Sequence, residues 1–132
     1  MTLEGYDEFC RTLPATTTVV QWRGSHVWKV GGKVFAIGHE DDHQLSVTFK
    51  VSDIAYELLG TQPGLRPAPY LASRGMKWIQ HYARPGLSDA ELRDYIREAH
   101  AIVSRGLSKK RRAELGLATR QPAMAKASPT AR

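Results

Sequence analysis

The strongest constraint on the fold lies in residues 28–36, where alternating side chains flank a pair of glycines. The stretch reads Trp-Lys-Val-Gly-Gly-Lys-Val-Phe-Ala. Alternating apolar and polar residues are typical of a strand with one buried face, and two glycines readily take the positive φ angles of a two-residue turn. We therefore predict an antiparallel hairpin that turns at Gly31 and Gly32, with Trp28 facing the core and Lys29 facing solvent.

Three further segments have the composition of strands and are separated from the hairpin by turn residues. Residues 16–22 are rich in β-branched side chains, residues 43–51 alternate strictly between apolar and polar, and residues 76–82 place Met76 and Trp78 on one face. Such segments favour strands. Together with the two arms of the hairpin, they predict an antiparallel meander of about five strands.

Three helices are expected around this meander. Apolar residues recur at helical spacing in residues 3–12, and Ser52 precedes a short apolar helix that ends at Gly60. Ser88 and Glu91 have the spacing of a capping box, which predicts a helix over residues 89–105. The fold class is therefore α+β, with two layers: the meander packs against N-terminal, middle and C-terminal helices. Residues 61–69 contain three prolines and are expected to form an irregular connection.

The positive charge of the chain is concentrated at its C-terminal end. The 132 residues carry a net charge of +6, but residues 105–132 hold eight of the 19 lysines and arginines and only one acid. The sequence thus predicts a nearly neutral domain over residues 1–107, followed by a basic extension over residues 108–132. We expect a helical turn or two over residues 109–115 and disorder from residue 117 onwards.

Composition also indicates where the protein resides. No apolar run approaches the roughly 20 residues of a membrane span, and the N-terminus lacks the pattern of a secretory signal. Cys10 is the single cysteine, so no intrachain disulfide can form. We therefore expect a cytoplasmic protein without a membrane partner, whose oligomeric state the sequence leaves open.

Six short segments carry a resemblance to a known family. In chain order they are Leu13–Thr16, Trp28–Ala36, Leu45–Lys50, Pro67–Tyr70, Lys77–Ile79 and Leu87–Leu92. As an ordered set they resemble the YjbR/MmcQ-like family of small bacterial proteins, over about residues 3–107. The resemblance implies an α+β domain of the type called a double wing and, by fold analogy, DNA binding. It brings no catalytic residues, and Ala99-His100 stands where the family pattern has Ser-Tyr.

Catalytic and metal-binding patterns are weak. His39 and His43 flank the acidic turn at residues 40–42 and could hold a divalent ion, but such turns are more often simply solvated. The two histidines are four residues apart, as in a zinc protease, but the segment between them is predicted to be a turn rather than a helix. The sequence contains no Gly-x-Ser-x-Gly elbow. We therefore expect a protein that is not an enzyme and that has no cofactor and no metal site.

Nucleic-acid binding is the function that the charge favours. The candidate phosphate contacts are basic residues of the hairpin and of the C-terminal segment: Lys29, Lys33, Arg105, Lys109, Lys110, Arg111 and Arg112. Arg23 and Lys50 also lie in the meander, where Trp22 or Trp28 would stack on bases if it were exposed. We expect a non-enzymatic nucleic-acid-binding protein that contacts the phosphate backbone.

The alternative is a binding module for a protein or a small anion. Its candidate residues lie around the proline-rich connection and the last strand: Arg66, Tyr70, Arg74 and Trp78. The two hypotheses predict different structures. An exposed Trp22 or Trp28 beside basic residues favours nucleic acid, whereas a closed pocket around Tyr70 and Trp78 favours a ligand.

Overall fold

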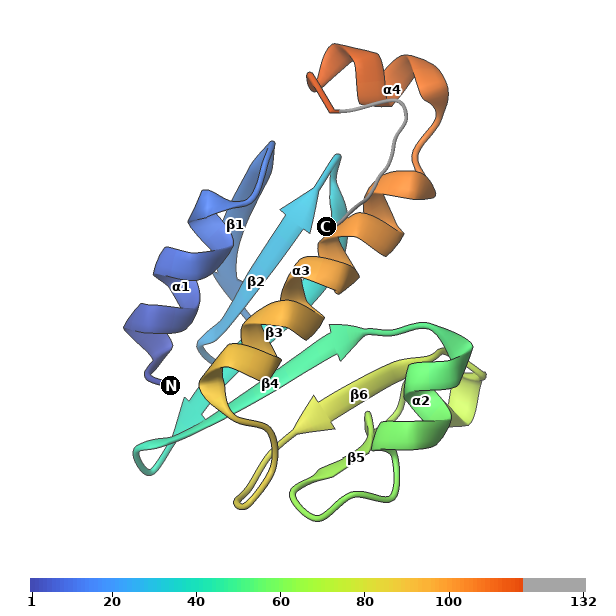
Figure 1. Ribbon diagram of the computed structural model, residues 1–132. Coiled ribbons are helices and arrows are strands. Elements are labelled where there is room, and N and C mark those ends of the chain that lie inside the picture. The colour runs from blue at the N-terminus through green and yellow to red at the C-terminus, as the bar shows by residue number, and fades with distance from the viewer. Residues whose placement is uncertain (118–132) are drawn as a thin grey trace.

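A computed structural model, which describes residues 1–117, shows one antiparallel sheet with helices packed on one of its faces (Figure 1). The six strands have the spatial order β1-β2-β3-β4-β6-β5. Their bounds are β1 Thr16–Gln21, β2 Ser25–Val30, β3 Lys33–Asp41, β4 Gln44–Lys50, β5 Leu65–Pro67 and β6 Trp78–His81. The helices are α1 Leu3–Thr12, α2 Asp53–Leu59, α3 Asp89–Arg105 and α4 Lys109–Glu114, with one 3-10 turn at Ala72–Arg74. The predicted α+β class and its two layers are confirmed.

The helices begin where the capping residues predicted. The side chains of Thr2, Ser52 and Ser88 each accept a hydrogen bond from a backbone N–H in the first turn of α1, α2 and α3. At α3, the Glu91 carboxylate in turn accepts a hydrogen bond from the Ser88 backbone N–H, which completes the capping box. These bonds satisfy amide groups that have no partner within the helix.

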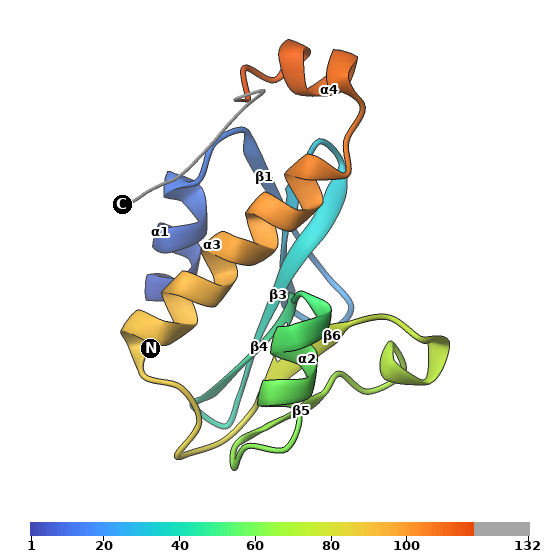
Figure 2. The ribbon, with the colours of Figure 1, turned by 45° about the vertical axis from the view of Figure 1, so that its right-hand side comes forward.

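The core lies between the helices and one face of the sheet. Tyr6 and Cys10 of α1 pack with Ile96 and Ala99 of α3 against buried side chains from β2, β3 and β4, and the two helices lie side by side (Figures 1 and 2). Tyr6 lies directly over Gly38 of β3, because a Cβ atom there would come within 2.3 Å of the ring. Glycine at this position therefore lets α1 approach the sheet.

The sheet has one strand more than predicted. We expected residues 61–69 to be irregular, but Leu65–Pro67 pairs antiparallel with β6, in the register Leu65↔His81 and Pro67↔Ile79. Proline is tolerated here because β5 is an edge strand and its outer side needs no amide donor. Three residues are too few to show alternation, so the sequence pattern did not reveal this strand.

The packed chain continues past residue 107, the predicted end of the domain. Residues 109–114 form α4, and the side chains of Leu107 and Leu117 are buried in the core cluster, with Leu115 packed against it. Leu107 and Leu115 contact the β2–β3 turn, where a Cβ atom on Gly31 would come within 2.6 Å of Leu107. Disorder was predicted from residue 117 onwards; Leu117 is instead packed, and residues 118–132 lie outside the described residues.

His100 links α3 to the end of α1, and its burial makes stability dependent on pH. Its Nε2 atom lies 2.8 Å from the Pro14 carbonyl oxygen, and the ring meets Phe35 edge-on. Desolvation by burial lowers the pKa of His100, although the hydrogen bond to Pro14 raises it. The unfolded chain, with a histidine pKa of about 6.5, therefore binds the proton more readily.

We expect the free energy of unfolding to fall as the pH drops from about 7.5 to about 5. His81, whose pKa is also lowered chiefly by desolvation, contributes in the same direction. Urea titrations at several pH values will measure this loss, and it is expected to be smaller in the variant His100→Gln. An unchanged pH dependence in that variant would show that His100 is not a source of acid sensitivity.

Candidate nucleic-acid interface

The helices leave one face of the sheet uncovered, and the strand register shows which side chains lie on it. One row across this face runs from Val19 through Val27, Ile37 and Thr48 to Gln80 and Arg66. A second row contains Gln21, Ser25, His39 and Ser46. Because successive side chains of a strand point to opposite faces, both rows face away from α1 and α3.

The two rows of this open face carry no carboxylate. They consist of aliphatic side chains, polar groups and Arg66. Asp41, at the end of β3, lies on the same side of its strand beyond the second row. Lys29 of β2 points to this side, and Arg66 of β5 donates a hydrogen bond from Nε to Gln80 Oε1, 2.7 Å away. The Arg66 guanidinium also lies 4.4 Å from the ring centroid of Tyr82. Cations beside rows without an acid attract anions.

The β1–β2 turn holds an aromatic side chain over one end of the open face. Trp22 is 60 % exposed. Trp22 and Arg23 both have positive φ angles, 50° and 63°, which non-glycine residues rarely adopt. Backbone strain of this kind is frequent at binding sites. Both residues line a hollow of about 340 Å³ together with His39, Ser46, Thr48 and Gln80.

Trp28, in contrast, belongs to the core, as the alternation predicted. It is 2 % exposed, and its indole N–H donates a hydrogen bond to Asp7 Oδ1 at 2.8 Å. The other oxygen of Asp7 lies 2.6 Å from His26 Nδ1. A single carboxylate on α1 therefore satisfies two polar side chains of β2, and Trp28 is not available to a ligand.

The other predicted phosphate contacts gather at one end of the molecule. Because the Gly31 turn packs on Leu107 and Leu115, Lys33 of the hairpin lies at the same end as α4 (Figure 1). We call this group the basic end; it comprises Lys33, Arg105, Lys109, Lys110, Arg111 and Arg112. Arg105 and Arg111 pair with Glu98 and Glu114 at 3.7 and 3.5 Å, whereas within residues 1–117 the other four cations have no carboxylate partner within 4.0 Å.

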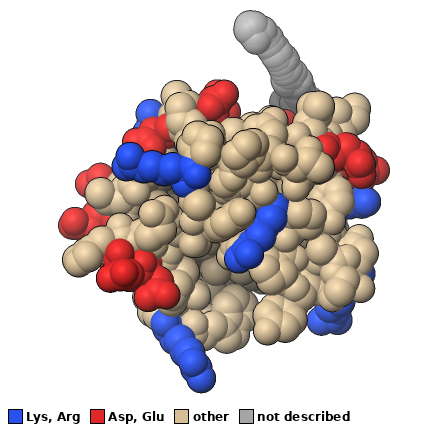
Figure 3. Space-filling model, turned by 90° about the horizontal axis from the view of Figure 1, so that it is seen from below, with Lys and Arg blue, Asp and Glu red and all other residues tan. Residues whose placement is uncertain are grey.

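The opposite end of the molecule has a different charge distribution. Figure 3 views the protein from the end away from α4, and there acidic and basic side chains are dispersed among uncharged residues. Cations are thus concentrated at the basic end, and the open face adds Lys29 and Arg66.

The structure does not bring the four residues of the alternative hypothesis together. Tyr70 projects into solvent, with 87 % of its surface exposed, whereas Trp78 is only 5 % exposed. Arg66 lies on the open face against Gln80, and Arg74 lies in the exposed 3-10 turn. Only Trp78 of this set lines one of the cavities described below.

Two features bear on metal binding and thiol chemistry in the described part of the chain. Within residues 1–117, no three His, Cys, Asp or Glu side chains gather in a way that could hold a metal ion. Cys10 is buried, and desolvation raises its thiol pKa well above the ordinary value. A thiol of this kind is a poor nucleophile. Among the same residues, no helix is long and apolar enough to cross a membrane.

Comparison with known proteins identifies the family. A family model described as YjbR matches residues 11–102, which is most of the chain. The chain belongs to the YjbR family. Among curated proteins, none matches this YjbR-family sequence.

Two solved structures have the same fold. One is a Deinococcus radiodurans protein with a domain described as DUF419, with 23 % sequence identity, a TM-score of 0.75 and 89 % of each chain covered. The other is a Pseudomonas syringae protein, with 16 % identity, a TM-score of 0.61, 77 % of this chain covered and 98 % of the other. At these identities the likeness concerns the fold alone.

Some residues of this YjbR-family surface were not expected from the sequence. His39, Thr48 and Gln80 line the hollow below Trp22, but they come from three strands and are ordinary polar residues in an alternating pattern. They could have been found by taking the polar residues of each strand and asking which of them lie next to one another once the strands are paired. That register depends on pairing between distant strands, which the sequence pattern does not specify.

Proposed function

We propose that this protein binds nucleic acid, without catalysing a reaction, and that single strands are the form it prefers. The observation that carries this proposal is the exposed Trp22, held beside Arg23 over a sheet face that has no acid in its two continuous rows. Exposed aromatic rings stack on unpaired bases of any sequence, and neighbouring cations contact the phosphates. Bases within a duplex are already stacked on one another and leave Trp22 no partner.

Strand β2 connects the two surfaces that attract phosphate. Trp22 lies just before the six residues of β2, and Lys29 lies near the end of the strand, close to the turn that packs on α4. Six residues of strand span about 20 Å. A single strand that begins at Trp22 would therefore reach Lys29 and then the basic end, where Lys109 and Lys110 are exposed.

The stacking role of Trp22 can be tested by fluorescence anisotropy with a labelled single-stranded oligonucleotide. We expect Trp22→Ala to weaken binding about tenfold or more, because base stacking contributes about 1–3 kcal/mol. Tyr70→Ala is the matched control, since it removes another exposed aromatic ring that does not line the hollow below Trp22, and it should bind as the unmodified protein does. Equal losses in the two variants would contradict a specific role for Trp22.

The same measurement at several salt concentrations distinguishes the two basic surfaces. We will compare Lys29→Ala/Arg66→Ala with Lys109→Ala/Lys110→Ala; each pair removes two cations, and each lost phosphate contact lowers the salt slope by about one. A loss confined to the second pair would place phosphate binding at the basic end alone. Binding that all variants retain, or no binding by any form, would overturn the proposal. Point variants are preferable to truncation at residue 107, which would remove the packed side chains of Leu115 and Leu117.

A further inference from the structure

The sheet splits at one end, and a cavity lies in the split. The pairing of β3 with β4 ends at Ala36↔Phe49, although both strands continue beyond that pair. From there β3 stays with β2, while Lys50 of β4 pairs with Trp78 of β6. Figure 1 shows β3 and β4 diverging toward this end. The C-terminal half of α3 lies beside the gap, so that residues of two sheet halves and one helix line a common space.

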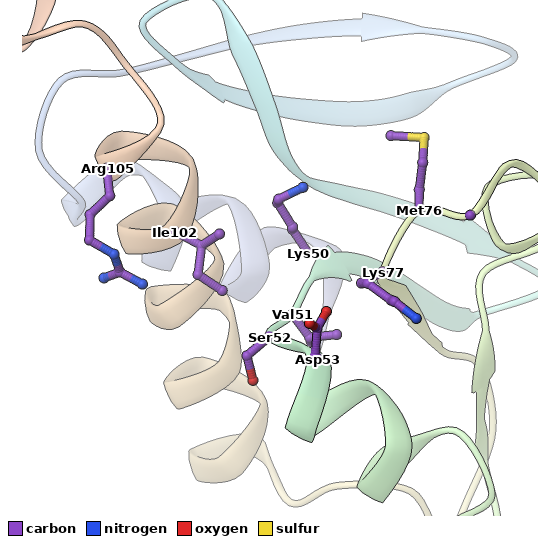
Figure 4. Close-up of a pocket in the computed structure, with 9 residues that line it drawn as sticks. Lys50, Val51, Ser52, Asp53, Met76, Lys77, Ile102 and Arg105 are labelled. Carbon is purple, nitrogen blue, oxygen red and sulfur yellow. The ribbon is translucent and has the colours of Figure 1, made fainter.

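Three cations from different parts of the chain line this space. A cavity of about 550 Å³ is bounded by Lys50 at the end of β4, Lys77 just before β6 and Arg105 at the end of α3 (Figure 4). Asp53 is the one acidic residue in its lining. Within residues 1–117, neither lysine has a carboxylate within 4.0 Å. Arg105 pairs with Glu98 at 3.7 Å, and the Lys77 ammonium lies 4.6 Å from the ring centroid of Tyr56. The positive charge that no carboxylate of residues 1–117 pairs with is therefore that of the two lysines.

An adjoining cavity of about 460 Å³ is largely apolar. It shares Lys50, Met76 and Ile102 with the first and is bounded in addition by Val34 and Trp78. Trp78 is 95 % buried, and its indole N–H has no hydrogen-bond partner in the protein. A buried donor without an acceptor is unfavourable and is rare in native proteins. Lys50 lies over this ring, with its Nζ atom 5.9 Å from the centroid, and its side chain is long enough to move aside.

We propose that the two adjoining cavities form one site for a small organic phosphate with an aromatic or apolar body. In Figure 4 the charged ends of Lys50, Lys77 and Arg105 point apart around the cavity. A phosphate bound between them would require these long side chains to turn inward, where ammonium and guanidinium groups bind phosphate through charge-assisted hydrogen bonds. The apolar body would lie against Met76, Ile102 and Trp78. As Lys50 turns toward the phosphate, the Trp78 N–H becomes accessible and donates to a ligand oxygen. Lys50 and Trp78 lie two residues from Thr48 and Gln80 on the same side of their strands, so this site adjoins the open face. Neither residue lines the hollow below Trp22, and the proposal does not rest on nucleic-acid binding.

Proton–nitrogen correlation NMR of the full chain tests this site, because each of the three tryptophans gives a separate indole N–H signal. Trp22→Phe and Trp78→Phe assign the signals. We will titrate phenyl phosphate as the probe, with phenol and inorganic phosphate as controls for the two parts of the molecule. We expect a saturable downfield shift of the Trp78 signal with phenyl phosphate, weaker effects with either control, and an unmoved signal from Trp28, whose N–H already donates to Asp7.

Two variants that each remove one positive charge test whether Lys77 contributes to phenyl phosphate binding. Lys77→Met keeps the length of the side chain and removes the charge, and we expect it to weaken phenyl phosphate binding about tenfold, the effect of one lost charge-assisted hydrogen bond. Arg93→Met removes an exposed charge of α3 that lines neither cavity, and it should leave the affinity unchanged. Equal losses would show that only the net charge of the protein matters, which would contradict a built site.

Other outcomes would also overturn the proposal. A shift of the Trp22 signal in place of Trp78 would place phenyl phosphate on the open face. A Trp78 signal that moves equally with phenol would mean that the cavity takes apolar molecules without regard to charge. The Trp78 signal could also shift with a 5′-phosphorylated single-stranded oligonucleotide and not with phenyl phosphate. That result would assign the cavity to a nucleic-acid phosphate. Failure here leaves the anisotropy result for Trp22→Ala unaffected, so the two proposals can fail separately.

Discussion

Replacing Trp28 by alanine is expected to lower the free energy of unfolding by about 3–5 kcal/mol. The side chain is fully enclosed between α1 and the sheet, and the surrounding backbone can close only part of the space that its removal leaves. The change also deprives Asp7 of the indole N–H that donates to it. Urea unfolding, followed by circular dichroism, will measure the loss.

Trp22→Ala is the matched control, since it makes the same chemical change at an exposed position. Its effect on stability is expected to stay within about 0.5 kcal/mol, the usual range for surface substitutions. The two tryptophans should thus show opposite behaviour: Trp28 affects stability and Trp22 affects binding of the oligonucleotide. A large stability loss for Trp22→Ala would mean that its ring packs on the sheet rather than being held for a ligand.

Replacing Gly38 by valine is expected to destabilise the protein by about 3 kcal/mol. A Cβ atom at this position would lie 2.3–2.8 Å from three ring carbons of Tyr6, and that ring is completely buried. Tyr6 cannot easily move, because its hydroxyl donates a hydrogen bond to the His26 carbonyl oxygen at 3.0 Å. Valine is itself favourable in strands, so the loss would report the clash rather than a poor strand residue.

Two further variants show whether the clash with Tyr6 is the cause. Gly106→Ala adds a Cβ atom where the nearest atom is 3.4 Å away and φ is not positive, so this variant should be as stable as the original. In a protein that already carries Tyr6→Leu, and so lacks the ring, Gly38→Val should lower the free energy of unfolding by less than it does in the unmodified protein. Additive effects of the two changes would contradict the proposed contact, because residues in contact show coupled effects.

The elements of the fold could be predicted because their signals are local. The capping residues Thr2, Ser52 and Ser88 lie within three residues of the amides they satisfy, and the Gly-Gly turn acts on its own hairpin. Alternation also predicted which face of β2 is buried, and hence that Trp28 would be in the core. β5 was missed because its stability comes from pairing with β6 and from packing, and its own three residues carry no pattern.

The two candidate sites could be predicted only in part. The sequence located the basic residues of the hairpin and of α4. Whether Trp22 would be buried depended on the shape of the β1–β2 turn. In that turn Trp22 and Arg23 have positive φ angles, which residues other than glycine rarely adopt. The Gly31 contact with Leu107 and Leu115, which brings the hairpin and α4 together, joins residues that are far apart in the chain. The alternative hypothesis grouped Trp78 with Tyr70 and Arg74, whereas the structure places Lys50 and Met76 beside it.

The sequence by itself determined the α+β class, the start of each helix, the central hairpin and the concentration of charge at the C-terminal end. Periodicity, capping and turn preferences act over a few residues, and charge can be counted without coordinates. The tertiary structure alone decided that Trp22 is exposed beside two strand rows without acids and that β3 and β4 diverge to leave a cavity lined by Lys50, Lys77 and Arg105. Both features arise from how distant strands pair and twist and from where α3 crosses them, and no local pattern encodes that geometry.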